Sequence, residues 1–297
     1  MILDVKKPVV LAPMGFVSGG ALAAAVSRAG GLGLIGAGYG DPDWMRRQFD
    51  AAGGARVGVG FITWSLAQRA ELLDLALERK PCAVMLSFGD PRPFAAKVRK
   101  AGARLILQVQ NLASARQALE AEPDVLVAEG TEAGGHGGDR SLFALLPAVK
   151  DIAGKVPVLA AGGIADRRGY EAALALGAAG VLVGTRFIAC DEALAGPRAK
   201  QRIVQANGDS TLRTTVFDIV RGYDWKGITG RALRNRFTAT WHGSEEKLKE
   251  KLAAERKAYL EAVERQDFDT ALIFAGEGVD LIDDIVPAAE LVERIAG

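Results

Sequence analysis

One histidine stands in a setting that suggests proton chemistry. His136 lies in the glycine-rich segment Glu129-Gly130-Thr131-Glu132-Ala133-Gly134-Gly135-His136-Gly137-Gly138-Asp139. Its small neighbours leave room around the imidazole for a ligand, and histidine exchanges protons near neutral pH. We therefore predict that His136 is a catalytic residue, with helix capping or loop bracing as the alternative. The other histidine, His242, stands next to Trp241 with no partner visible in the sequence, and we expect it to be structural.

Two further segments have the composition of anion-binding loops. They are Ala160-Ala161-Gly162-Gly163-Ile164-Ala165-Asp166 and Gly184-Thr185-Arg186-Phe187. Because glycine has no side chain, such a loop can bring several backbone N–H groups close to a phosphate. The two segments predict a phosphorylated cofactor or substrate. A tight strand-to-helix turn would also explain Gly162 and Gly163.

The remaining candidates are the segment Ala12-Pro13-Met14-Gly15 and the single residue Gln108. Proline fixes the chain and lacks an N–H, and a following Met suits a backbone laid against a flat ring, although ordinary turn chemistry has the same composition. Gln108 is a polar side chain at the end of an apolar run. Contact with a polar heterocycle or a phosphate is one explanation, and a hydrogen bond inside the core is the other.

Eight short apolar runs precede segments of helical period, a pattern typical of successive βα units around a parallel sheet. Eight such units in roughly 205 residues match a closed α/β fold, the (β/α)8 TIM barrel, whose active site lies at the C-terminal ends of the strands. The candidate segments above follow strands one, five, six, seven and eight. The predicted strands are residues 8–12, 32–36, 57–61, 82–86, 104–108, 124–128, 157–161 and 180–184.

Beyond about residue 207, apolar runs no longer alternate with segments of helical period. We divide the chain into a barrel (1–206), a helical subdomain over the barrel mouth (207–270) and a C-terminal segment that packs back on the barrel (271–297). A strongly charged helix is expected at about 245–264, with its charges on a solvated face.

Composition excludes several classes of function. The 297 residues are 49% hydrophobic and 25% charged, as in ordinary globular proteins, and the formal net charge of +1 gives no global field for nucleic acid. No apolar run is long enough for a membrane span and residues 1–10 do not read as a signal peptide, so we expect no membrane segment and a cytoplasmic location. With only Cys82, Cys190 and two histidines, we expect no metal.

Taken in order, these motifs resemble the nitronate monooxygenase family, formerly called 2-nitropropane dioxygenases. The resemblance covers nearly the whole chain. Its motifs are Ala12-Pro13-Met14-Gly15, Ala29-Gly30-Gly31-Leu32-Gly33, Glu132-Ala133-Gly134-Gly135-His136-Gly137, Ala161-Gly162-Gly163-Ile164-Ala165-Asp166, Gly184-Thr185-Arg186-Phe187 and the ending Phe274-Ala275-Gly276-Glu277-Gly278-Val279.

The resemblance implies an FMN-containing TIM barrel with His136 as the catalytic base. Two positions depart from the family pattern: Arg167 follows Asp166 where the family commonly has Gly, and Gln108 stands where some relatives carry Lys. Residues implied in FMN binding are Ala12, Pro13 and Met14 along the isoalloxazine, Gln108 at its polar edge, Gly134 and Gly135, and the phosphate-binding Gly162, Gly163, Gly184 and Thr185.

The implied reaction is oxidation of an alkyl nitronate by O2 to a carbonyl compound and nitrite, with a nitronate or a neutral nitroalkane as substrate. The same barrel also serves FMN-dependent NAD(P)H reductases acting on enoyl-acyl-carrier-protein or quinones, so this alternative stays open. A third hypothesis is a flavin- or phosphate-binding module without turnover. The oligomeric state is open as well, a homodimer included.

Overall fold

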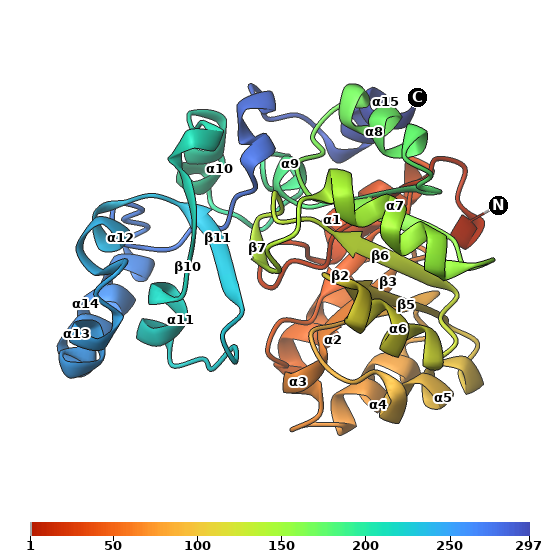
Figure 1. Cartoon of the computed structure of the whole chain (residues 1–297), viewed down its shortest axis with the longest axis horizontal. Helices are drawn as coiled ribbons and strands as arrows, with labels where there is room; N and C mark the ends of the chain where they lie inside the picture. The colour runs from red at the N-terminus through yellow and green to blue at the C-terminus, as the bar shows by residue number, and fades with distance from the viewer. Residues whose placement is uncertain (1) are drawn as a thin grey trace.

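The computed structural model describes residues 2–297, and its core is a barrel of eight parallel strands. The strands follow the order β1-β9-β8-β6-β5-β4-β3-β2. Figure 1 labels β2, β3, β5 and β6 of this series, with helices outside them. A parallel bridge between Val10 and Leu32 joins the two ends of this series and closes the barrel. The predicted (β/α)8 fold is therefore confirmed.

Each of the eight predicted runs forms a strand within one or two residues of its predicted bounds. Parallel strands are buried on both faces, so they appear in a sequence as nearly continuous apolar runs. The strands are β1 (Val9–Leu11), β2 (Leu34–Gly36), β3 (Gly58–Ile62), β4 (Ala83–Ser87), β5 (Arg104–Val109), β6 (Val125–Glu129), β8 (Val158–Ala161) and β9 (Gly180–Val183).

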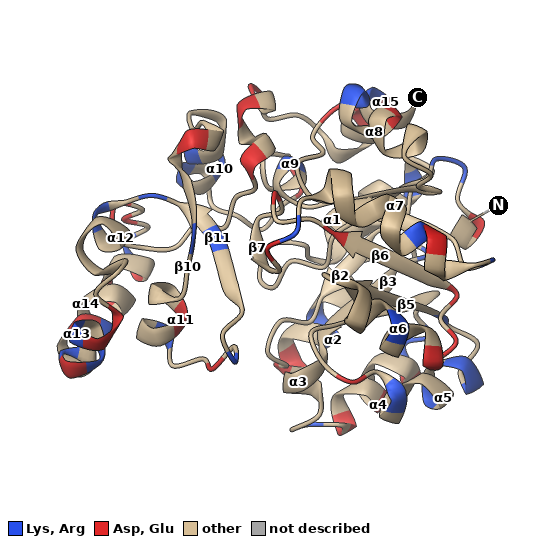
Figure 2. Ribbon diagram, viewed as in Figure 1, with Lys and Arg blue, Asp and Glu red and all other residues tan. Residues whose placement is uncertain are grey.

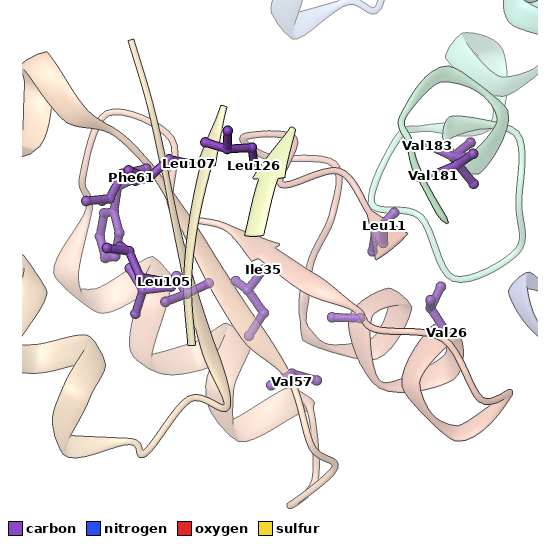
Figure 3. Packing of buried hydrophobic residues seen from close by; sticks show 14 of the residues in the cluster. Leu11, Val26, Ile35, Val57, Phe61, Leu105, Leu107, Leu126, Val181 and Val183 are labelled. Atoms are coloured by element: carbon purple, nitrogen blue, oxygen red, sulfur yellow. The ribbon is translucent and has the colours of Figure 1, made fainter. Parts of the chain in front are cut away.

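Helices cover the outside of the barrel, and two apolar layers hold the fold together. Along β5, Leu105 and Leu107 pack into the outer layer beneath the helices (Figure 3), whereas Ile106 belongs to the cluster inside the barrel. Leu3 and Val5 join the inner cluster. The helices of this region are α1 (Gly20–Arg28), α2 (Pro42–Ala51), α3 (Thr63–Leu66), α4 (Glu71–Glu78), α5 (Arg92–Lys100), α6 (Leu112–Glu120), α7 (Leu142–Ala153), α8 (Arg167–Ala175), α9 (Thr185–Ile188) and α10 (Pro197–Val204).

The segment after the barrel contains strands as well as helices. Strands β10 (Thr211–Thr214) and β11 (Thr229–Leu233) form an antiparallel sheet with β7 (Gly135–Gly137), which carries His136. The prediction for residues 207–270 was a helical subdomain, and it did not include these strands. Through β7, this segment is attached directly to the glycine-rich loop of the barrel. Its helices are α11 (Val216–Arg221), α12 (Arg236–Trp241), α13 (Glu245–Glu250) and α14 (Leu252–Glu264).

The charged helix predicted at 245–264 is two helices, α13 and α14, separated at Lys251. Most of the charged residues of α13 and α14 are exposed. Figure 2 shows charged residues along these two helices and along the outer helices of the barrel. The C-terminal helix α15 (Ala288–Ala296) packs against α1 and α8. Within residues 2–297 no helix is long and apolar enough to cross a membrane.

Candidate active site

A cavity of about 580 Å³ opens at the C-terminal ends of the eight parallel strands. This volume is in the range of small-molecule sites, about 300–1,000 Å³. Most of its lining is apolar, with a few polar groups. The structure brings every site residue predicted from the sequence to this lining: Ala12, Pro13, Met14, Gln108, Gly134, Gly135, His136, Gly162, Gly163, Gly184 and Thr185.

The loop after β8 presents unpaired backbone N–H groups to the cavity. Gly162 has φ +114° and Gly163 has φ +70°, conformations that a side chain disfavours. Among residues 2–297, none accepts a hydrogen bond from the N–H of Gly162, Gly163 or Gly184. Asp166 ends this loop as the N-cap of α8, where it accepts from Gly169 N at 3.2 Å. We call these N–H groups the anion cradle.

The C-terminal motif is packed tightly against this cradle. A Cβ on Gly134 would lie 2.6 Å from Gly276 N, and one on Gly278 would lie 2.6 Å from Gly163 O, so neither position has space for a side chain. Gly276 N donates to Thr185 Oγ1 at 3.0 Å. The ending of the chain therefore completes the same wall of the cavity.

The end of β1 forms an apolar ledge beside the cradle. Ala12 N donates to Val183 O at 2.9 Å, which ties this segment to β9. A Cβ on Gly184 would lie 3.5 Å from Ala12 Cβ and 3.6 Å from Met14 Sδ. Ala12, Met14 and Gly184 thus border one surface next to the unpaired N–H groups.

Glu129, the last residue of β6, is a cavity residue that we did not single out from the sequence. It is 7% exposed, and its Oε2 accepts from Gln108 Nε2 at 2.8 Å and Gln110 Nε2 at 3.0 Å. Burial raises the pKa of Glu129 to about 7. Gln108 makes the interior hydrogen bond that was its second explanation, and it also lines the cavity; its contact with a ligand stays a prediction. The only signal for Glu129 was its position, a carboxylate at the C-terminal end of a barrel strand.

His136 is held mainly by side chains from residues 207–270, which we call the appended segment. Its Nε2 lies 2.9 Å from Asp218 Oδ2 on α11, its ring stacks on Trp225 with 3.4 Å between ring centroids, and Phe274 contacts it edge-on. Asp218 can only accept when ionised, which assigns the proton to Nε2 and leaves the Nδ1 lone pair available. Burial lowers the pKa of His136, although Asp218 acts in the opposite direction. The ring is thus a neutral base near pH 7.

Trp225 belongs to a cluster of aromatic rings at the edge of the cavity. Its Nε1 donates to Tyr39 Oη at 3.1 Å, and Tyr39 stacks on Tyr223 with 3.7 Å between centroids. The Arg221 guanidinium lies 4.8 Å from the centre of the Tyr223 ring, a cation–π arrangement. His242 lies away from the cavity lining, where its Nδ1 is 3.1 Å from Thr214 Oγ1.

The arrangement combines an anion cradle, an apolar ledge and a neutral base around one cavity. Such a site can hold a phosphorylated planar ligand and move a proton beside it. The ledge and cradle come from the barrel. Two partners of the base, Asp218 and Trp225, come from the segment between β10 and β11, and Phe274 comes from the C-terminal segment.

Comparisons with known proteins extend over nearly the whole chain. A family model described as nitronate monooxygenase matches residues 1–56 and 60–297. The nitronate monooxygenase npaC from Metarhizium robertsii is 37% identical over 265 residues, which span 78% of this chain and 74% of that protein. A nitronate monooxygenase from Paraburkholderia phytofirmans is 32% identical, spanning 99% of this chain and 92% of that protein.

Solved structures also match nearly the whole chain. FabK from Thermotoga maritima superposes with a TM-score of 0.87 at 32% identity, covering 99% of this chain and 93% of that one. Nitroalkane oxidase from Streptomyces ansochromogenes superposes with a TM-score of 0.82 at 29% identity, covering 98% and 95%. This chain belongs to the nitronate monooxygenase family, whose members are flavin-dependent oxidoreductases.

Proposed function

We propose that this protein is an FMN-dependent nitronate monooxygenase, which oxidises alkyl nitronates with O2 to carbonyl compounds and nitrite. The observation that carries the proposal is the combination, in one cavity, of the unpaired N–H groups of the anion cradle with a neutral His136. The family membership supplies the reaction class.

The residues present fit FMN. Gly162, Gly163 and Gly184 offer backbone donors for one phosphate, with Thr185 beside them, and Ala12, Pro13 and Met14 offer an apolar ledge for a flat ring. Gly134 and Gly135 border the same space, and Gln108 adds a polar group to its lining. When bound, FMN supplies the electron acceptor that the oxidation requires.

His136 would act when the substrate arrives as a neutral nitroalkane. Nδ1 accepts the proton from the carbon next to the nitro group, and the bonding electrons move toward the nitro oxygens, giving the nitronate. Asp218 orients the ring and stabilises the imidazolium through Nε2. A substrate that arrives as nitronate has already lost this proton. The apolar lining excludes water around the reacting carbon.

Oxygen uptake with a nitronate, compared with NADH oxidation in the presence of an enoyl thioester or a quinone, tests the proposal. We expect a yellow protein that releases FMN on denaturation, consumes O2 and forms nitrite with the nitronate. The likeness to FabK favours one second candidate, an FMN-dependent NAD(P)H reductase on the same barrel. NADH oxidation without nitronate turnover would establish that candidate, and a protein that cannot be reconstituted with FMN would contradict both.

A further inference from the structure

Only one of the two oxygens of the Glu129 carboxyl group accepts hydrogen bonds from the protein. Oε2 accepts two hydrogen bonds, from the side chains of Gln108 and Gln110. Within residues 2–297, no group donates a hydrogen bond to Oε1, although the residue lines the cavity. Oε1 is not among the fully buried unpaired polar atoms of the described residues, so it is open to the cavity, where it can form a hydrogen bond with a ligand.

Glu129 and His136 face the same cavity with their pKa values shifted in opposite directions. Burial raises the pKa of Glu129 to about 7 and lowers that of His136. Paired titratable groups whose environments separate their pKa values in this way mark the acid and the base of a site. Near neutral pH Glu129 can hold a proton while His136 is free to accept one.

The charged groups around Glu129 come from the appended segment. Arg213 on β10 is the charged group that acts on its carboxyl, in the direction that favours ionisation. Arg231 on β11 is the cross-strand neighbour of Arg213 and is paired with Glu277 at 2.8 Å. A Cβ on Gly137 would lie 2.5 Å from Arg213 Nη2 and 3.3 Å from Glu129 Oε2, so this glycine keeps the space between the two groups open. The effect of burial on Glu129 outweighs that of Arg213.

We propose that Glu129 is a neutral hydrogen-bond donor of the site, which donates from protonated Oε1 to an anionic oxygen of the bound substrate. With a nitroalkane, the C–H bond breaks, its proton goes to His136, and the negative charge that develops on a nitro oxygen is stabilised by the Glu129 O–H. Glu129 keeps its own proton in this step. The identity of the substrate rests on the proposed function, whereas the binding of a small anion does not.

This role makes anion binding depend on pH. Ionised Glu129 would repel an anion and could no longer donate, so affinity should fall about tenfold for each pH unit well above pH 7. Among the groups lining the cavity, His136 has its pKa lowered and Tyr39 has its pKa raised to about 12. Between pH 7 and 9 the dependence is therefore assigned to Glu129.

Nitrite is a suitable probe because it is a small O–N–O anion that stays ionised over this range. Its affinity for the FMN-loaded protein is measured from the flavin absorbance between pH 6 and 9. We expect the affinity of the wild type to fall above pH 7 and that of Glu129→Gln to stay level, since the amide still donates and cannot ionise. Glu132→Gln is the matched control, because Glu132 lies outside the cavity lining, where its carboxylate accepts from Leu142 N. It should behave as the wild type does.

Proton uptake gives a measurement on the wild type alone. At pH 8, calorimetry in buffers of different ionisation enthalpy should show that about one proton is taken up for each nitrite bound. No proton uptake, no nitrite binding at any pH, or an equal fall in the wild type and Glu129→Gln would overturn the proposal. If nitrite binds as expected but no nitronate is oxidised, the proposed function fails while the role of Glu129 stands.

Discussion

The two sides of the cavity use different kinds of chemistry. On the barrel side, the loops after β8 and β9 present backbone N–H groups, and the ledge at Ala12 and Met14 is apolar. On the other side, His136 is positioned by side chains of the appended segment, chiefly Asp218 and Trp225. The barrel side needs small residues that allow close approach, whereas the appended side needs specific functional groups.

This difference indicates how the two sides can be altered independently. Backbone donors bind any phosphate of the right shape, so the barrel side can keep one cofactor while the reaction changes. The appended side determines the protonation state and orientation of the base. Substitutions on the two sides should therefore affect different measurements, cofactor affinity on one side and turnover on the other.

The largest effect is expected from His136→Asn, which keeps a polar side chain but removes the proton acceptor. Turnover of a neutral nitroalkane should fall by roughly two to four orders of magnitude, the usual contribution of general-base catalysis. Turnover of a preformed nitronate should fall much less, because that proton is already gone. Steady-state kinetics with both substrate forms and a measurement of FMN content check this. An equal loss on both forms would contradict the role of a base, and would indicate an orienting role instead.

The next effect is expected from Asp218→Asn. An amide can donate to Nε2, which would move the imidazole proton to Nδ1 and remove the basic lone pair from the cavity. We expect turnover of the nitroalkane to fall by about tenfold to a hundredfold, an intermediate effect for a positioning residue. The kinetic pKa of His136 should also fall, because Asp218 now acts to raise it.

Asp224→Asn is the matched control for this substitution. Asp224 lies in the same segment but is exposed, where it pairs with Lys226. It should leave both turnover and FMN content unchanged. An Asp218→Asn variant with the pH profile of the wild type would contradict the positioning role.

The same contrast between the two sides explains which parts of the site could be predicted from the sequence. The eight strands follow from apolar runs, and the cradle follows from glycines such as Gly162 and Gly163 at the ends of those runs. Both features are local in the chain. The structure confirms the fold, and the predicted site residues all line one cavity.

The partners of His136 could not be predicted because they depend on pairing over a long distance. Asp218 is 82 residues from His136 in the sequence. It reaches His136 through the antiparallel pairing of β7 with β11, and β7 is a stretch of glycines and one histidine that has no strand-like alternation. No local pattern in the sequence indicates that Trp225 stacks on His136. Glu129 was within reach of sequence analysis, since it directly follows the predicted strand 124–128.

On the barrel side, Gly162→Val should weaken FMN binding about tenfold or more. A branched side chain is strained at φ +114°, and its Cβ would lie 3.1 Å from Ala133 N and Gly130 O. Strain of this kind costs on the order of 1–3 kcal/mol. Fluorescence titration of the apoprotein with FMN measures the dissociation constant. Gly154→Val, at a glycine with φ +58° and open space around it, controls for strain alone. Equal FMN affinity in the wild type and Gly162→Val would mean that the loop is only a tight strand-to-helix turn.

The smallest effect is expected on stability, and it concerns the appended side again. Because folding lowers the pKa of His136, the unfolded chain binds more protons at this residue than the native protein below about pH 6.5. The native state therefore loses stability as the pH falls through this range, and it keeps its full stability above it. His136→Asn has no such group, so it should gain stability relative to the wild type as the pH falls from 7 to 5. Urea unfolding of both proteins at several pH values measures the difference in free energy, in which the titration of all other groups cancels. The opposite trend, with the wild type gaining relative stability in acid, would mean that Asp218 dominates over burial and that His136 is protonated in the native protein.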